Sequence, residues 1–354
     1  MNAVQPGMAR LPEWQRIEAA FRGVFERRYF ANNGPLVRAL DDALPVAMGV
    51  AHAVCVTNGT VALILLAASL TSALEKRGEV IVPAFAPPST LHAVQWAGLT
   101  PVLADVDAET HGLTANTVSA RITPDTVAIC AVHRWGIPCD VDGLTALAAQ
   151  RDIPLLFDGR EAAGAQWRGR DIGAYGAGTA FSLHAASVLG AGEGGFVATN
   201  DAVVADRLRT MRNFRPSETF APVSLRTNGK MSEAQAAMGL LAVEDMPRTL
   251  AANAERAGVY ADGLRGVGVL QAPQGAFANG HSVVITVEPA KRDRIVAALA
   301  AAGITAYLPE PLPGSERFAV ADRLNRTVLQ LPSGPGLSLA DVGRVCAAVR
   351  GGAA

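Results

Sequence analysis

The chain has 354 residues, enough for two domains or for one large domain with a small appendage. Half of the residues are apolar and only 5% are aromatic, so the core must consist mainly of Ala, Val, Leu and Ile. The formal net charge of -1 argues against a nucleic acid or another polyanion as a partner.

The first 15 residues lack the apolar run of a signal peptide, and no apolar stretch reaches the ~20 residues that span a bilayer. We therefore expect a cytoplasmic protein without a membrane partner. The four cysteines form no CxxC pair and no zinc-type spacing with histidine, which predicts buried free thiols and no metal site. Only three of the 31 basic residues are lysines (Lys76, Lys230 and Lys291), so few amines are available for chemistry.

The N-terminal third opens with a surface arm and one helix at 11–27, followed by a second helix at 36–48. A short buried strand at 53–56 then leads into an almost wholly apolar helix at 60–74. From there strands alternate with helices. The expected strands are 80–83, 101–105, 127–132, 154–158 and 180–184, and the expected helices are 89–97, 114–120 and 141–150.

Continuous apolar strands that alternate with helices predict an α/β large domain with a mixed, mostly parallel sheet covered by helices on both faces. Past residue 228 the pattern changes to helices at 231–246 and 250–264, and then to a small α+β unit with strands at 282–287 and 305–307 and helices at 290–302 and 338–350. We expect an N-terminal arm and helix at 1–30, a large domain at 31–245 and a small C-terminal domain at 246–354.

The most informative stretch is 179–200, which reads TAFSLHAASVLGAGEGGFVATN. An apolar strand ends at His184, a turn of small residues contains Ser187, and several glycines precede a returning strand at 196–199. Such a turn holds a reactive side chain at the edge of a sheet. Because ligands gather beyond the carboxyl ends of parallel strands, we expect one site formed by 58–60, 83–88, Asp105, His133, Asp158 and His184.

Four of these positions have alternative interpretations. At Asn58-Gly59-Thr60, free backbone N–H groups at the start of a helix suit a phosphate, or Thr60 simply caps its own helix. Asp158 pairs with a protonated ring nitrogen of a ligand, or it forms a salt bridge to Arg160 or caps a helix. His133 and His184 are catalytic residues or hydrogen-bonded structural residues.

A series of short motifs occurs in order along the chain: Asn33-Gly34-Pro35, Asn58-Gly59-Thr60-Val61-Ala62-Leu63, Val80-Ile81-Val82-Pro83, Asp105-Val106-Asp107, Val132-His133, Asp140-Val141-Asp142, Phe181-Ser182-Leu183-His184, Glu193-Gly194-Gly195, Met231-Ser232-Glu233 and Gly303-Ile304. With these motifs the chain resembles the DegT/StrS family of sugar aminotransferases over nearly its whole length. The resemblance implies the fold type I of enzymes that depend on pyridoxal phosphate (PLP).

The resemblance also implies roles for individual residues. Gly59 and Thr60 would donate backbone N–H groups to the coenzyme phosphate, and Ser182 its hydroxyl. Asp158 would keep the pyridine nitrogen protonated, which makes the ring an electron sink. Asn228 would reach the phosphate in a neighbouring subunit, so a homodimer is expected.

The departures from the family pattern are equally informative. The family reads Ser-Phe-His-x-x-Lys where this chain reads Ser182-Leu183-His184-Ala185-Ala186-Ser187, so Ser187 stands where the family has its Schiff-base lysine. Pro87 or Pro88 replaces a stacking aromatic residue, and Phe157-Asp158-Gly159-Arg160-Glu161 replaces Glu-Asp-Ala-Ala-Gln/His. Tyr307-Leu308-Pro309 replaces a late His-Tyr-Pro segment. A serine hydroxyl forms no imine and is a very weak base, so ordinary transamination should be lost or very slow.

Four hypotheses follow. In the preferred one, the chain is an enzyme that binds PLP or its amine form PMP non-covalently, or no coenzyme. Ser187, His184, Asp158 and Glu161 then carry acid–base chemistry. Its substrate is a nucleotide-linked keto sugar or another small carbonyl metabolite, with Pro87, His133, Lys230 and Tyr307 beside it. The alternatives are a non-catalytic subunit that completes an aminotransferase heterodimer through Asn228 and Lys230, an engineered lysine-to-serine transaminase, and a Ser187–His184 hydrolase.

Overall fold

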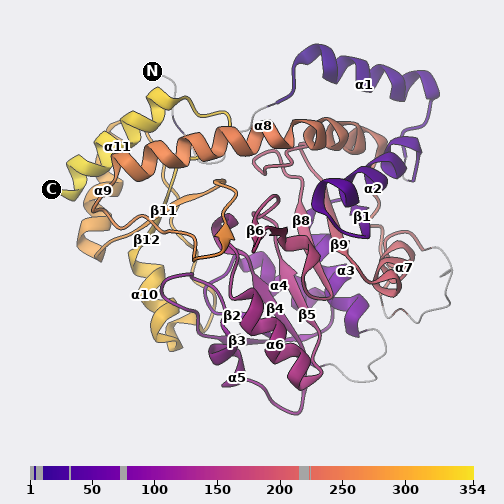
Figure 1. The fold of residues 1–354 in the computed structure, drawn as a ribbon, viewed down its shortest axis with the longest axis horizontal. Coiled ribbons are helices and arrows are strands. Elements are labelled where there is room, and N and C mark those ends of the chain that lie inside the picture. Colours follow the sequence, from indigo (N-terminus) through magenta and orange to yellow (C-terminus); the bar gives the residue numbers. More distant parts are fainter. Residues whose placement is uncertain (1–3, 5–10, 32, 72–77, 215–222, 224) are drawn as a thin grey trace.

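A seven-stranded sheet forms the centre of the computed structural model, which describes residues 4, 11–31, 33–71, 78–214, 223 and 225–354 (Figure 1). Only β9 runs antiparallel to its neighbours, and the remaining pairs are parallel. This confirms the expected mixed, mostly parallel sheet. The strands lie in the order β1 (His52–Val56), β9 (Gly195–Thr199), β8 (Gly178–Ser182), β5 (Leu155–Asp158), β4 (Thr126–Val132), β2 (Glu79–Pro83) and β3 (Thr100–Ala104).

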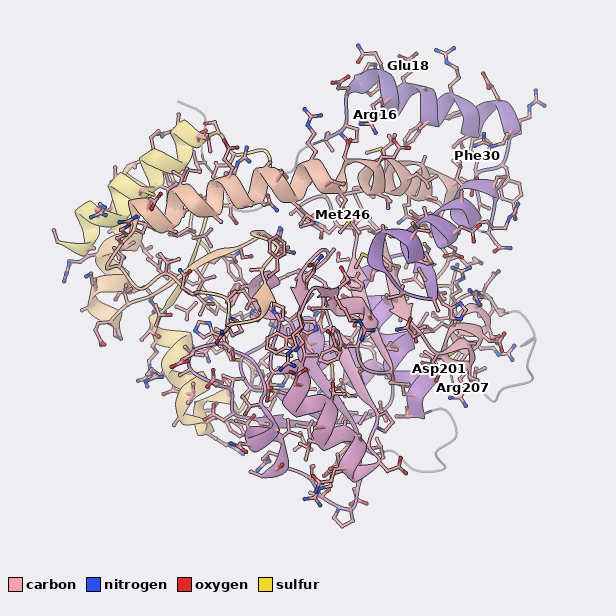
Figure 2. All side chains as sticks on the ribbon, in the orientation of Figure 1. Arg16, Glu18, Phe30, Asp201, Arg207 and Met246 are labelled. Carbon is pink, nitrogen blue, oxygen red and sulfur yellow. The ribbon has the colours of Figure 1, made fainter. Side chains whose placement is uncertain are left out.

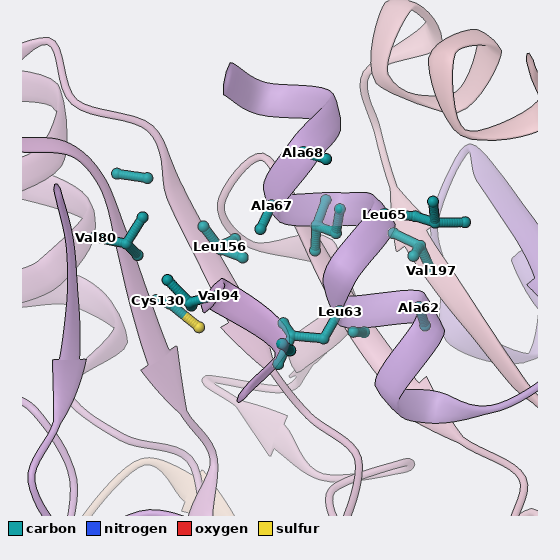
Figure 3. Packing of buried hydrophobic residues seen from close by; sticks show 14 of the residues in the cluster. Ala62, Leu63, Leu65, Ala67, Ala68, Val80, Val94, Cys130, Leu156 and Val197 are labelled. Carbon is teal, nitrogen blue, oxygen red and sulfur yellow. The ribbon is translucent and has the colours of Figure 1, made fainter. Parts of the chain in front are cut away.

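Helices cover both faces of this sheet because alternate strand residues point to opposite sides. One face packs against α3 (Gly59–Thr71), α4 (Pro88–Trp96) and α7 (Ala202–Met211). Figure 3 shows α3 at the centre of this layer, with Leu63 and Ala67 close to sheet residues such as Leu156. The other face packs against α2 (Pro35–Met48), α5 (Ala115–Ser119), α6 (Val141–Arg151) and the first part of α8.

The helix α8 (Glu233–Gly263) is continuous over 31 residues, so the prediction of two helices at 231–246 and 250–264 is wrong. Pro247 lies inside it, and a proline removes one helical N–H bond. Packing outweighs that loss because Met246 belongs to the core of the large sheet and Tyr260 to a separate core. The expected domain boundary near residue 245 falls within this helix, which spans the molecule from α2 to α11 (Figure 1).

The second core belongs to a smaller α+β unit. Its sheet pairs β11 (Val283–Thr286) with β12 (Val328–Leu331), and its helices are α9 (Pro289–Ala301), α10 (Ala319–Thr327) and α11 (Leu339–Ala353). The predicted strand at 305–307 is reduced to one bridge between Tyr307 and Gln330. The segments β12, α10 and α7 were not predicted; they are only 4, 9 and 10 residues long.

The helix α1 (Trp14–Arg27) lies outside the sheet and packs against α8 (Figure 2). Arg16 donates to both carboxylate oxygens of Asp245, at 2.8 and 2.9 Å. A small three-stranded sheet joins β6 (Gln166–Trp167), β7 (Arg170–Asp171) and β10 (Ala276–Phe277). All four cysteines are buried and unpaired, as expected. None of the described helices is long and apolar enough to cross a bilayer.

Candidate active site

A cavity of about 1290 Å³ opens at the carboxyl ends of β4, β5 and β8, where it meets the first turn of α3. Its position is the one expected for a ligand site in an open parallel sheet. Ten of the residues singled out from the sequence line it: Asn58, Gly59, Thr60, Pro87, His133, Asp158, Glu161, Ser182, His184 and Ser187.

Asp158 is the last residue of β5, between Val132 of β4 and Ala180 of β8. The chain then turns sharply, because Ala162 N–H donates to the Gly159 carbonyl at 2.8 Å. A Cβ at Gly159 would lie 2.6 Å from Thr179 Cγ2, so this turn requires glycine. The turn directs Arg160 back over the end of its own strand.

Arg160 and Asp158 form a two-pronged ion pair at the bottom of the cavity. Arg160 Nε donates to Asp158 Oδ1 at 2.8 Å, and Nη2 donates to Oδ2 at 2.6 Å. The two side chains are only 12% and 2% exposed. Of the interpretations open for Asp158, the structure shows the salt bridge to Arg160.

The rest of the guanidinium is held by hydroxyl groups. Nη1 donates to Ser89 Oγ at 2.8 Å and to Thr60 Oγ1 at 3.3 Å, and Nη2 also donates to Thr90 Oγ1 at 3.1 Å. Thr90 in turn donates to Asp158 Oδ2 at 2.7 Å. One side chain therefore connects the end of β5 with the first turns of α3 and α4.

The charge of Arg160 determines the ionisation of Asp158. Burial alone would raise the pKa of Asp158, but the adjacent guanidinium and its hydrogen bonds, with one from Thr90, lower this pKa below its ordinary value of 3.8. Asp158 is thus a carboxylate with both oxygens engaged, which leaves it no free lone pair directed at a ligand without displacement of Arg160.

The first turn of α3 is capped by Asn58, and Thr60 does not provide the cap. Asn58 Oδ1 accepts from Val61 N–H at 2.9 Å. Gly195 of β9 packs so closely here that a Cβ would lie 2.4 Å from the Asn58 carbonyl carbon. Thr60 Oγ1 is instead the partner of Arg160.

The loop after β8 carries His184 and Ser187. Backbone bonds close it, with Ala185 N–H donating to Gly192 O at 2.8 Å and Ser187 N–H donating to His184 O at 2.7 Å. Ser182 Oγ accepts from His184 N–H at 3.1 Å, and His184 Nδ1 accepts from Ala186 N–H at 3.2 Å. Within the described part of the chain, Ser187 Oγ makes no hydrogen bond to the His184 ring, so the hydrolase hypothesis gains no support.

Glu161 faces the same cavity and is oriented by two donors. Arg134 Nη1 lies 3.3 Å from Glu161 Oε1, and Trp135 N–H donates to Oε2 at 3.1 Å. Arg134 is buried and lies 3.8 Å over the Trp135 ring, whose residue adopts a positive φ of 63°. The Glu161 side chain remains 33% exposed, so this carboxylate can still contact a ligand.

Two histidines in the cavity wall keep a ring nitrogen without a partner in the described structure. His133 Nδ1 accepts from Cys139 N–H at 3.2 Å, its ring stacks on Phe157, and its buried Nε2 has no partner. Burial lowers the pKa of His133 to about 3, so the ring is neutral. His281 has a buried Nδ1 without a partner, and burial lowers its pKa despite the nearby charge of Glu161.

Four other predicted positions do not reach this cavity in the single chain. Asn228 is exposed, Lys230 Nζ lies 5.6 Å from the Phe214 ring centroid, and Tyr307 is 42% exposed beside β12. Asp105 accepts from the N–H groups of Val320 and Ala321 and thereby caps α10. Lys76 lies outside the described residues. The roles expected for Asn228 and Lys230 involve a second subunit and stay predictions.

The sequence predicts the salt bridge between Asp158 and Arg160 as one alternative, but it does not predict that Ser89, Arg134 and His281 join this site. The available signal was the cation two residues after Asp158, at a position where the resembled family has alanine. A long cationic side chain that follows a strand-terminal carboxylate past a glycine can fold back onto it. Nothing in the local pattern, however, places Ser89 or Thr60 within its reach.

These residues do not fit a pyridoxal coenzyme in the position that the resemblance implies. That position requires a ring nitrogen at Asp158 and a phosphate at Gly59 and Thr60. Arg160 hydrogen-bonds both Asp158 and Thr60, and a Cβ at Gly59 would lie 3.0 Å from its Cδ. The Arg160 side chain therefore already occupies the space between Asp158 and the Gly59-Thr60 turn, where the coenzyme would lie. No cluster of metal-binding side chains occurs among the described residues either.

The family model and the related proteins that match this chain all indicate the same family. The model of the DegT/DnrJ/EryC1/StrS aminotransferase family matches residues 13–350. The chain is 36% identical over 329 residues to the UDP-N-acetyl-3-dehydro-alpha-D-glucosamine 3-aminotransferase of Acidithiobacillus ferrooxidans, covering 88% of this chain and 87% of that protein. It is 32% identical over 355 residues to the erythromycin biosynthesis sensory transduction protein EryC1 of Saccharopolyspora erythraea, covering 95% of each.

Solved structures are similar to the chain as well. The structure of DesI in the presence of its TDP-sugar product has a TM-score of 0.92 and 32% sequence identity, and the match covers 100% of this chain and 93% of DesI. The arrangement of strands and helices described above is therefore that of a known enzyme architecture.

Proposed function

The chain belongs to the DegT/DnrJ/EryC1/StrS aminotransferase family, and from this premise we propose that it acts on a nucleotide-linked keto sugar by acid–base chemistry of its own side chains, without transamination. The names of its relatives support the substrate class, since one acts on a UDP-linked keto sugar and DesI was solved with a TDP-sugar product.

One observation carries the proposal: none of the described residues that line the cavity is a lysine. Ser187, at the position where the family pattern has its lysine, is half-buried in the loop after β8. An amine is needed to form an imine and then to move a proton, and a hydroxyl does neither near neutral pH. Lysine-dependent amino transfer would therefore lack its central group.

What remains in the cavity suits proton transfer beside a carbonyl group. Glu161 is a positioned, partly exposed carboxylate, which is the geometry required of a general base. His184 is an exposed imidazole on the neighbouring loop and can serve as its acid partner, with Ser187 as a hydrogen-bond donor to the substrate. Asp158 contributes to this site through its negative charge, which keeps Arg160 in place through two hydrogen bonds.

The test is proton exchange on a bound keto sugar. In D₂O, the wild-type chain should introduce deuterium at the carbon next to the carbonyl of a UDP- or dTDP-linked keto sugar. NMR monitors this incorporation. Glu161→Gln should slow this exchange by about 10²-fold or more, because general-base catalysis is typically worth that factor. Glu193→Gln is the matched control, since Glu193 lines the same cavity on an exposed loop and has no ion pair with any described residue.

A calorimetric titration with the same nucleotide sugars separates binding from turnover. Binding without exchange would favour the non-catalytic partner subunit over the enzyme. Absence of both binding and exchange for every nucleotide sugar tested would overturn the proposal.

A further inference from the structure

All five N–H donors of the Arg160 guanidinium have acceptors. Nε–H and one Nη2–H are directed at the Asp158 carboxylate, the other Nη2–H at Thr90, and the two Nη1–H groups at Ser89 and Thr60. A guanidinium with every donor engaged is not free to bind a substrate anion. The guanidinium is therefore bound in the inner cavity in the way that a ligand would be.

We propose that Arg160 is a resident replacement for the coenzyme, a covalently attached cation that occupies the inner part of the cavity and excludes PLP and PMP from it. This inference shares its cavity with the proposed function but does not otherwise rest on it. It concerns the inner end, whereas the sugar chemistry concerns the outer wall formed by Glu161 and His184.

The charges explain why a guanidinium is a suitable replacement. The family role implied for Asp158 is to face a protonated ring nitrogen, which is a cation with one N–H donor. A carboxylate that is 2% exposed is costly without such a partner. Arg160 supplies the same positive charge with two donors to the same carboxylate, so the buried charge stays compensated without a coenzyme.

Contacts along the stem of the side chain make the occupation specific. A Cβ at Gly59 would lie 3.0 and 3.1 Å from Arg160 Cδ and Cγ, so the stem packs against the first turn of α3. The same turn would supply the backbone N–H groups of a phosphate site. The head of Arg160 thus covers the acidic end and its stem covers the phosphate end.

The proposal predicts a ligand-dependent rescue of stability. Arg160→Ala should open the inner cavity and leave Asp158 buried and unpaired, lowering the midpoint of thermal unfolding by about 5 °C or more. Added PMP should restore the midpoint of this variant, because PMP brings back a ring cation and a phosphate. PMP is the better probe because it forms no imine with surface lysines. The wild-type chain should show neither a PMP-dependent shift nor binding by calorimetry.

Arg134→Ala is the matched control. It also removes a buried arginine paired with one carboxylate near the same cavity, and it should be destabilised without rescue by PMP. PMP binding to the wild-type chain would overturn the proposal. So would an Arg160→Ala variant that PMP does not stabilise, or one that stays unfolded in its presence. The experiment contains no sugar, so its outcome is independent of whether the proposed reaction occurs.

Discussion

At the scale of single residues, the cavity is defined by two arginine–carboxylate pairs with different tasks. Arg160 and Asp158 are both almost fully buried and engage each other completely. Arg134 is buried and its Nε has no partner among the described residues, while Glu161, which pairs with its Nη1, stays partly exposed. The first pair is closed to ligands, and the second presents an oriented carboxylate to them.

The sequence identified both carboxylates but not this division of tasks. Asp158 ends β5 and Glu161 lies three residues later in the turn that follows, and their partners come from position 160 and from the segment after β4. Which arginine reaches which carboxylate depends on the turn at Gly159 and on the positive φ at Trp135. Neither feature can be inferred from residue type alone.

His133 gives a residue-scale prediction for pH dependence. Its pKa in the folded chain is about 3, against 6.5 ordinarily, because burial disfavours the charged ring. Below pH 6.5 the unfolded chain binds a proton that the folded chain does not, so His133 lowers the free energy of unfolding as the pH falls toward 3. Between pH 7 and 5 this amounts to about 2 kcal/mol.

The measurement compares the wild-type chain with His133→Gln by chemical denaturation at pH 7 and pH 5. The stability advantage of the wild type over the variant should shrink by about 2 kcal/mol on acidification. Other titrating groups such as His111 and Asp171 are present in both chains and cancel in the difference. An advantage that stays constant between the two pH values would contradict a buried, neutral His133.

At the scale of elements, the joint between α2 and α8 is held by one buried carboxylate. Glu233, the first residue of α8, accepts from the N–H groups of Leu36 and Val37, both at 3.0 Å, in the first turn of α2. A negative charge there also favours the positive end of the α2 dipole. A Cβ at Gly34 would lie 2.5 Å from this carboxylate, which explains the glycine before the helix.

Glu233→Ala should therefore lower the free energy of unfolding by about 2 to 4 kcal/mol, because two buried N–H groups lose a charged acceptor. Glu244→Ala is the control on the same helix. Its ion pair with Arg16 is 65% exposed at the glutamate and should contribute under about 1 kcal/mol. Urea denaturation, monitored by circular dichroism, measures the free energy of unfolding of both variants. An equal loss of this free energy in the two variants would refute a special role for Glu233.

The elements that the sequence predicted well are those whose pattern is set by burial. The strands at the centre of the sheet are mainly apolar, because helices cover both faces, and each was found within two residues of its predicted limits. The long helix α8 was divided because Pro247 is a strong local signal for a helix end, whereas packing against two cores keeps the helix intact. Such contacts between distant parts of the chain cannot be predicted from the local sequence pattern around Pro247.

At the scale of the whole molecule, several features suit association of two copies. Trp96 lines the edge of the cavity and is 77% exposed, and Val46 of α2 is 84% exposed. An exposed tryptophan beside a cavity is the kind of surface that a second subunit covers. The expected homodimer, with Asn228 reaching the neighbouring cavity, stays a prediction, as does the heterodimer.

Light scattering on the purified chain tests this expectation. A mass of twice the calculated 36.7 kDa is expected, because the exposed apolar side chains favour self-association. A Trp96→Glu substitution should shift the distribution toward the monomer, whereas Leu339→Glu on α11, an exposed apolar position that does not line the cavity, serves as the control. A stable monomer that pairs only with another aminotransferase chain would instead support the partner-subunit hypothesis.

The most direct measurement for the whole molecule is amino transfer itself. The wild-type chain would be incubated with excess PLP, ¹⁵N-labelled glutamate and a nucleotide-linked keto sugar, and the sugar would be examined by NMR. Because Ser187 offers no amine and Arg160 occupies the space beside Asp158, no ¹⁵N should enter the sugar above the level of a protein-free control. Enzymatic incorporation of the label, with the protein turning yellow and giving a borohydride-reducible adduct, would contradict this result.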